Sequence, residues 1–301
     1  MKRQALGIAA LVLLAGLAGW LLSQRSGNVN RSDRGIQVMT SLPILRNLAE
    51  IVGGKEVNVD SIIRGTACAH EYEPTPGDMK QVAKCAIFVK AGMGFDTWAD
   101  RLLKSAGNES AEIIDASFGV TIIKDGHEYD LDGEQHNPHY WGSPENVKVM
   151  AGNILAGLVE VRPERKQYFT ANYENFIARL DKAIVALRAK VAGLANRRIV
   201  SYSACFPYFY TYFGFDNLAT VETTCEQEVA PKRLAAVAKL MREKHIRIIV
   251  GEEVYPRLPE SLARETGAKV VLLWPTTNDS GDCLETIRAN VEKMVSALNA
   301  N

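Results

Sequence analysis

The fold is decided by residues 163–194, which read PERKQYFTANYENFIARLDKAIVALRAKVAGL. Apolar residues recur there at spacings of three and four and form one stripe: Phe169, Tyr173, Phe176, Ile177, Leu180, Ile184, Leu187 and Val191. This period predicts a single helix with one apolar face. Pro163 suits a first helical turn, and Gly193 with Asn196 suits a stop. At about 1.5 Å per residue, some thirty residues span roughly 45 Å, the length of a domain.

Strands and helices alternate on both sides of this helix. Before it, apolar strands are expected at 36–40, 57–63, 87–89 and 113–115, with helices such as 44–52 and 79–83 between them. After it, strands are expected at 199–201, 218–221, 246–250 and 269–273, with helices such as 232–244 and 259–266. Such alternation predicts parallel sheets covered on both faces. We therefore predict an α/β fold with two similar lobes, 36–162 and 196–301, joined by one long backbone helix, 163–195. The apolar stripe is short for a coiled-coil dimer, so we expect a monomer with a rigid strut and limited hinge motion.

The first 25 residues have the pattern of a membrane-targeting segment. Lys2 and Arg3 precede an apolar run at 5–22, and a polar linker at 26–35 follows. A cleaved signal peptide and a retained membrane anchor both fit this pattern. In either case we expect the rest of the chain to be periplasmic or otherwise extracytoplasmic.

Composition limits the partners and the cysteine chemistry. A formal net charge of +0 and a pI of about 7.0 give no support for nucleic-acid binding. Five cysteines are an odd number for an exported chain, so at least one is free, metal-bound or paired with another molecule. Cys85 begins an expected strand and is predicted to be an inert core thiol. For the others, a disulfide or a ligand role stays open; they are Cys68, Cys205, Cys225 and Cys283, in expected loops or strand ends.

Two of the five histidines lie in proline-marked turns about seventy residues apart. His70 belongs to the stretch AHEYEPTP at 69–76, and His139 belongs to NPHYW at 137–141. Proline stiffens each turn, and a neutral imidazole is a common ligand for divalent metals. A single turn histidine is ordinarily a surface residue, but two in matched settings predict one metal site built from separate segments.

These motifs resemble those of the metal-binding solute-binding proteins of zinc and manganese ABC transporters, the class with a helical backbone between its lobes. The resemblance covers about 38–298. It includes the opening MTSLPIL at 39–45, the His-Glu-Tyr-Glu-Pro-Thr turn at His70, and NPHYW followed by SPEN at 143–146. It implies that His70 and His139 are metal ligands, that the cargo is a divalent transition metal, and that the partner is a membrane permease.

The second lobe departs from the family pattern. Where the family has a third ligand, His or Glu, this chain has Ser203, and where the manganese branch has Asp it has Thr276. Hydroxyl groups are poor ligands for Zn²⁺, so other donors are needed. We select Cys205 and Asp279 as the candidates, with Zn²⁺ as the expected metal and Mn²⁺ or Cu⁺ as alternatives.

The sequence thus predicts a non-enzymatic protein that captures a transition metal, zinc above others, and delivers it to an ABC-transporter permease. One alternative is an exported zinc metalloenzyme with Glu73, Glu252 or Glu253 as base, although no HExxH motif is present. Another is a family member that has diverged to copper binding or to a non-transport role such as adhesion.

Overall fold

A computed structural model describes residues 35–64, 72–123, 129–130, 135–221, 229–277 and 281–300. His70, Cys68, Cys225 and Asp279 lie outside these residues, as does the predicted targeting segment. None of the described helices combines the length and the apolar character needed to cross a membrane.

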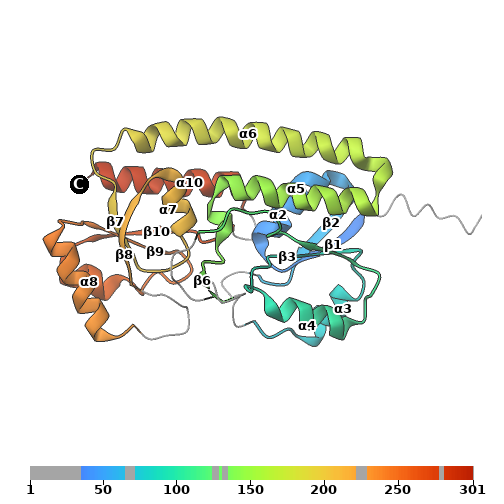
Figure 1. Ribbon diagram of the computed structural model, residues 1–301, viewed down its shortest axis with the longest axis horizontal. Helices are drawn as coiled ribbons and strands as arrows, with labels where there is room; N and C mark the ends of the chain where they lie inside the picture. The colour runs from blue at the N-terminus through green and yellow to red at the C-terminus, as the bar shows by residue number, and fades with distance from the viewer. Residues whose placement is uncertain are drawn as a thin grey trace, which may run out of the picture. The chain divides into compact units, whose positions relative to one another are not determined.

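The N-terminal lobe is built on a parallel sheet of four strands in the order β2-β1-β3-β4. In chain order the strands are β1 (Ile36–Thr40), β2 (Val57–Ser61), β3 (Ile87–Lys90) and β4 (Glu112–Asp115). The central strands β1 and β3 are almost continuously buried, as expected for a parallel sheet with helices on both faces. Its helices are α2 (Pro43–Gly53), α3 (Pro76–Val82), α4 (Thr97–Ala106) and α5 (Pro144–Val161). Figure 1 shows α3 and α4 on the opposite side of the sheet from α2 and α5.

The C-terminal lobe repeats this plan with the parallel strand order β10-β9-β7-β8. Its strands are β7 (Arg198–Ser201), β8 (Asp216–Thr220), β9 (Ile248–Glu252) and β10 (Lys269–Leu273). Its helices are α7 (Pro207–Phe213), α8 (Pro231–Glu243), α9 (Glu260–Thr266) and α10 (Cys283–Asn299). Between the lobes, β5 (Tyr129–Asp130) and β6 (Gln135–His136) form a short antiparallel ladder. The prediction of two α/β lobes with parallel sheets is confirmed.

The long backbone helix is α6 (Lys166–Ala192), about 40 Å in length. It packs on α2 and α5 of the first lobe and on α10 of the second (Figure 1). Most of the predicted apolar stripe is buried, but Tyr173 and Ile177 are only partly so. The helix begins three residues later than predicted, because Pro163–Arg165 form a 3-10 turn. A buried carboxylate holds this turn: Glu56 pairs with Arg162 at 3.2 Å and with Arg165 at 3.4 Å.

One hydrophobic core runs through both lobes. It extends from Ile36 in β1 through the buried face of α6 to Leu298 in α10. At the start of α10, the Cys283 backbone N–H donates to Asn47 Oδ1 at 2.9 Å, which ties this helix to α2. A separate, smaller cluster that includes Val237 and Met241 lies under α8. A shared core favours small adjustments between the lobes over a wide opening.

Several element limits in the second lobe differ from those predicted. Strand β9 ends at Glu252 and not at Val250, because the chain before it still closes helix α8: Ile246 N–H donates to Met241 O, and His245 has φ +53°. Cys283 was expected in a loop or strand end, but it is the buried first residue of α10. Cys85 precedes β3 and does not belong to it, yet it is a buried free thiol whose pKa burial raises to about 11. The prediction of an inert core thiol therefore fits this residue.

Candidate metal centre

His139 lies in the segment between the two lobes. It follows β6 and Pro138, and it precedes a 3-10 turn, Tyr140–Gly142, that leads into α5. Pro144 occupies the first turn of α5 and so fixes where that helix begins. The imidazole is buried, with only 7% of the residue exposed. The histidine predicted from its proline-marked turn is therefore an interior residue held between rigid elements.

Asn137 determines which nitrogen of His139 carries the ring hydrogen. Its Nδ2 donates to Ala204 O at 2.8 Å, which leaves Oδ1 to accept from the His139 backbone N–H at 2.9 Å. The same Oδ1 lies 3.1 Å from His139 Nδ1. Because Oδ1 can only accept, Nδ1 carries the ring hydrogen. His139 Nε2 therefore presents its lone pair, as in metal-ligating histidines whose second nitrogen is held by a neighbour.

Aromatic rings surround the imidazole. Phe95 and Trp141 both meet it edge to face, at centroid distances of 5.5 and 5.4 Å, and they meet each other at 4.9 Å. Trp141 Nε1 also donates to Pro275 O of the second lobe at 2.8 Å. These contacts limit access of water and keep the ring in one orientation.

A buried carboxylate holds the loop that bears Phe95. Asp96 is 3% exposed and accepts from the Ala91 and Gly92 backbone N–H groups at 2.6 and 2.9 Å. Burial raises the pKa of this carboxyl, and its hydrogen bonds lower the pKa by a smaller amount. The loop is therefore fixed by an ionisable group that solvent does not reach.

The second lobe contributes Cys205 from the loop between β7 and α7. Pro207 begins α7, and the Cys205 backbone N–H donates to Ser203 Oγ at 3.2 Å. Ser201 Oγ supports the same loop, because it donates to Ser203 O at 2.7 Å and lies 2.9 Å from the Tyr210 hydroxyl. Cys205 is of intermediate exposure. Its sulfur lies 3.4 Å from His139 Nε2, so the structure brings these two predicted ligands together.

Glu252 contacts the same sulfur. It ends strand β9, which neighbours β7, so both residues belong to the carboxyl edge of one parallel sheet. The Cys205 thiol donates to Glu252 Oε1 at 3.4 Å. Burial raises the pKa of the Glu252 carboxyl, and hydrogen bonds from Ser203 and Cys205 lower it by less. Ligand sites of open parallel sheets commonly lie at this edge.

His139 Nε2 and Glu252 Oε1 thus both lie within contact distance of the Cys205 sulfur. Within the described ranges, no three His, Cys, Asp or Glu side chains are arranged around a common point for a metal ion. The predicted ligands His70 and Asp279 lie outside those ranges and stay predictions. The segment that contains His70 begins just past β2, at the carboxyl edge of the first sheet, after Arg64.

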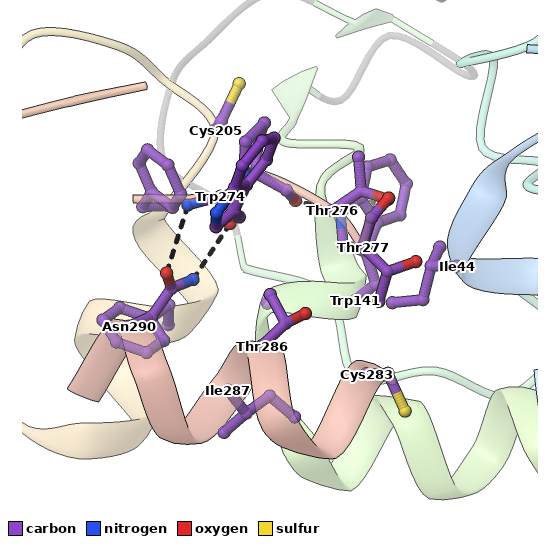
Figure 2. Close-up of a pocket in the computed structure, with 14 residues that line it drawn as sticks. Ile44, Trp141, Cys205, Trp274, Thr276, Thr277, Cys283, Thr286, Ile287 and Asn290 are labelled. Atoms are coloured by element: carbon purple, nitrogen blue, oxygen red, sulfur yellow. Dashed lines mark hydrogen bonds between the residues drawn. The ribbon is translucent and has the colours of Figure 1, made fainter. Parts of the chain in front are cut away.

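Ser203 and Thr276 both lie near Cys205. Ser203 is 6% exposed, and its side chain hydrogen-bonds Glu252. Its hydroxyl therefore orients a carboxylate. Thr276 donates to Thr277 O at 3.3 Å and lines a narrow pocket that Cys205 also borders. Figure 2 shows Cys205 and Cys283 at opposite ends of that pocket, whose free volume of about 30 Å³ suits a water-sized molecule.

Sequence reasoning did not select Asn137, and it named Glu252 only as a possible base of a metalloenzyme and not as a metal ligand. A signal for each was present. Asn137 lies two residues before His139, a spacing that lets its amide reach the same turn. Glu252 follows an apolar run in a parallel sheet, where polar side chains collect at the strand ends.

This fold and site define a class: a two-lobed binding protein with a histidine and a cysteine facing each other between its lobes. The family model described as "Zinc-uptake complex component A periplasmic" (ZnuA) matches residues 38–297, and the chain belongs to this family. The family falls among the substrate-binding proteins of metal ABC transporters.

Individual relatives agree with this assignment. The high-affinity zinc uptake system protein ZnuA of Bacillus subtilis (strain 168) is 26% identical over 88% of this chain and 86% of that protein. The manganese transporter substrate-binding lipoprotein PsaA of Streptococcus pneumoniae is 24% identical over 99% of this chain and 100% of that protein. A crystal structure of ZnuA superposes with a TM-score of 0.80 and 25% identity, covering 88% of this chain and 99% of that one. PsaA is thus named as a substrate-binding protein of a transporter, and ZnuA as a protein of a zinc uptake system.

Proposed function

We propose that this protein captures a transition metal, zinc above others, outside the cytoplasm and delivers it to the permease of an ABC transporter. The observation that carries the proposal is the buried His139, whose Nε2 faces Cys205 across the boundary between the lobes. A neutral imidazole of fixed tautomer beside a thiol is a suitable donor pair for zinc. Membership of the family supports transport as the purpose of binding.

The predicted ligand His70 completes the first-lobe half of the proposed site. It belongs to a segment that leaves the first sheet at its carboxyl edge and returns to the described chain at Tyr72. Tyr72 packs on Trp98 at a centroid distance of 5.1 Å and donates to Asp78 Oδ2 at 2.9 Å. The described residues on either side of the segment thus belong to the lobe that also leads to His139. Asp279 stays the lower-ranked candidate from the second lobe.

Export and delivery form the second half of the proposal. The basic and apolar start of the chain directs it across the membrane, as a cleaved signal or as a retained anchor. The protein would then act as a monomer and present its loaded form to the permease. The relative PsaA is named a lipoprotein, and the ZnuA family description names a periplasmic component, which supports this location.

Metal analysis and calorimetry on the full-length protein test the proposal. We expect one bound zinc per chain and weaker binding of Mn²⁺, with His70→Ala and His139→Ala each raising the zinc Kd at least about tenfold. His245→Asn is the matched control: it removes an imidazole at the end of α8, and Asn tolerates the positive φ found there. Absence of zinc binding by the wild type, or unchanged Kd in both alanine variants, would refute the proposal.

A further inference from the structure

We infer that Glu252 is a metal ligand and that it joins Cys205 and His139 in a mixed oxygen, sulfur and nitrogen donor set for zinc. The inference rests on the proposed function, because it names the second-lobe donors of the same site. It also accounts for the loss of ligand-type residues at Ser203 and Thr276.

The spacing of the three donor atoms supports coordination. In a tetrahedral zinc site, bonds of about 2.3 Å to sulfur and about 2.0–2.1 Å to nitrogen or oxygen place ligand atoms roughly 3.5 Å apart. Cys205 Sγ lies 3.4 Å from His139 Nε2 and 3.4 Å from Glu252 Oε1. Two edges of the donor triangle therefore already have the length that a zinc ion needs.

The single hydrogen of the Cys205 thiol cannot satisfy both acceptors beside the sulfur. Both His139 Nε2 and the Glu252 carboxylate are acceptors, and a thiol has one hydrogen, so it can donate to only one of them at a time. A cation in place of that hydrogen would interact with all three donors at once. The sulfur thus has a nitrogen and an oxygen with lone pairs beside it, as a thiolate ligand has in a metal site.

The setting of Glu252 differs from that of the next residue. Glu253 pairs with Lys293, whereas none of the salt bridges between described residues includes Glu252. Glu252 is only partly exposed, and a carboxylate withdrawn from solvent is ordinarily paired with a cationic side chain or coordinates a metal. Ser203 hydrogen-bonds the Glu252 carboxylate, and metal-ligating carboxylates are commonly oriented by such hydrogen bonds.

Metal binding must also bring the third pair of donor atoms, His139 Nε2 and Glu252 Oε1, to a suitable distance. Because no three donors of the described residues yet share a common point, metal binding has to draw Glu252 and His139 together around the sulfur. Trp141 packs on the imidazole and would report this movement through its fluorescence. A thiolate with an imidazole selects against Mn²⁺, and the added carboxylate favours Zn²⁺ over Cu⁺.

Cobalt spectroscopy and zinc calorimetry on the full-length protein test the inference. The variants are Glu252→Gln, which keeps the shape of the side chain, and Cys205→Ser, with Glu253→Gln as the matched control. We expect the wild type loaded with Co²⁺ to show a sulfur-to-metal charge-transfer band that Cys205→Ser lacks. Glu252→Gln should retain that band, alter the visible cobalt bands and raise the zinc Kd at least about tenfold. Glu253→Gln should match the wild type in both measurements.

The possible failures are distinguishable. A Glu252→Gln protein with wild-type spectrum and Kd would overturn Glu252 as a ligand while the proposed function stands. A charge-transfer band that persists in Cys205→Ser would overturn the thiolate. Failure of the wild type to bind zinc would refute the proposed function itself. Thermal unfolding of each metal-free variant checks that the change in binding does not come from loss of the fold.

Discussion

Replacing Asn137 by leucine should weaken zinc binding without removing any proposed ligand. Asn137 is 1% exposed and makes three contacts: its Oδ1 accepts from the His139 main-chain N–H and lies beside ring Nδ1, and its Nδ2 donates to Ala204 O. Leucine is branched at the same carbon as asparagine but can make none of these bonds. The imidazole would then be free to place its hydrogen on Nε2, the nitrogen that faces Cys205.

The expected magnitude follows from these contacts. Loss of a group that orients a metal-ligating histidine typically lowers metal affinity about 10- to 100-fold, which corresponds to roughly 1.4–2.8 kcal/mol. Stability should fall as well, because a buried N–H and a buried C=O lose their partner at about 1–3 kcal/mol each. Zinc calorimetry measures the first effect, and urea unfolding of the metal-free protein measures the second.

Two further variants separate tautomer control from simple destabilisation. Asn137→Asp keeps the acceptor for His139 and loses only the donor to Ala204, so its zinc Kd should rise less than that of Asn137→Leu. Asn153→Leu removes bonds to the Ala116 and Phe118 carbonyls in the first lobe, so it should lower stability and leave the Kd unchanged. Equal weakening by both substitutions at Asn137, or by Asn153→Leu, would show that tautomer control is not the cause.

Three other contacts give shorter predictions. Glu56→Gln should lower the free energy of unfolding by about 3 kcal/mol in urea, because it leaves two arginines beside a neutral group, and Glu164→Gln at an exposed site should change it little. Trp141→Phe keeps the ring beside the imidazole but loses the bond to the second lobe, so zinc release to a chelator in stopped flow should become faster; an unchanged rate would exclude that bond from holding the lobes together. Asp96 has a folded-state pKa raised above its ordinary 3.8, so its contribution to stability is present below that pH and lost as pH rises through the folded pKa. In denaturant titrations from about pH 4 to about pH 7, the wild type should therefore lose stability relative to Asp96→Asn, and parallel curves for the two proteins would contradict this.

The sequence predicts the architecture well because the architecture depends on periodicity. The stripe in α6 and the buried runs of β1 and β3 follow directly from apolar spacing. Strand limits are less predictable because they depend on tertiary contacts. The end of α8 holds Ile246 in its closing turn, which shifts β9 by two residues and places Glu252 at the strand end.

The site was predictable only in part for a similar reason. His139 and Cys205 belong to residue types that bind metals, and their local turns are visible in the sequence. Glu252 is one carboxylate among 35 acidic residues, and nothing in its neighbours along the chain separates it from Glu253. What separates them is the register of β9 against β7, which puts Glu252 beside the Cys205 loop while Glu253 meets Lys293 from α10.

Ser203 stands where the family pattern has a histidine or glutamate. We interpret this as a shift of the metal-binding position from 203 to Cys205 within the same loop. Ser203 is buried and bonded to Glu252, and its Oγ also accepts from the Cys205 backbone N–H. A small hydroxyl at this position thus links a carboxylate from β9 to a thiol two residues further along its own loop. A histidine at 203 would fill the space in which these two side chains meet. We therefore expect Ser203→His to disturb the contact between Cys205 and Glu252, so that a cobalt-loaded variant loses the sulfur charge-transfer band even though it has gained an imidazole. A band of unchanged intensity in that variant would show that the serine is not needed to bring the thiol and the carboxylate together.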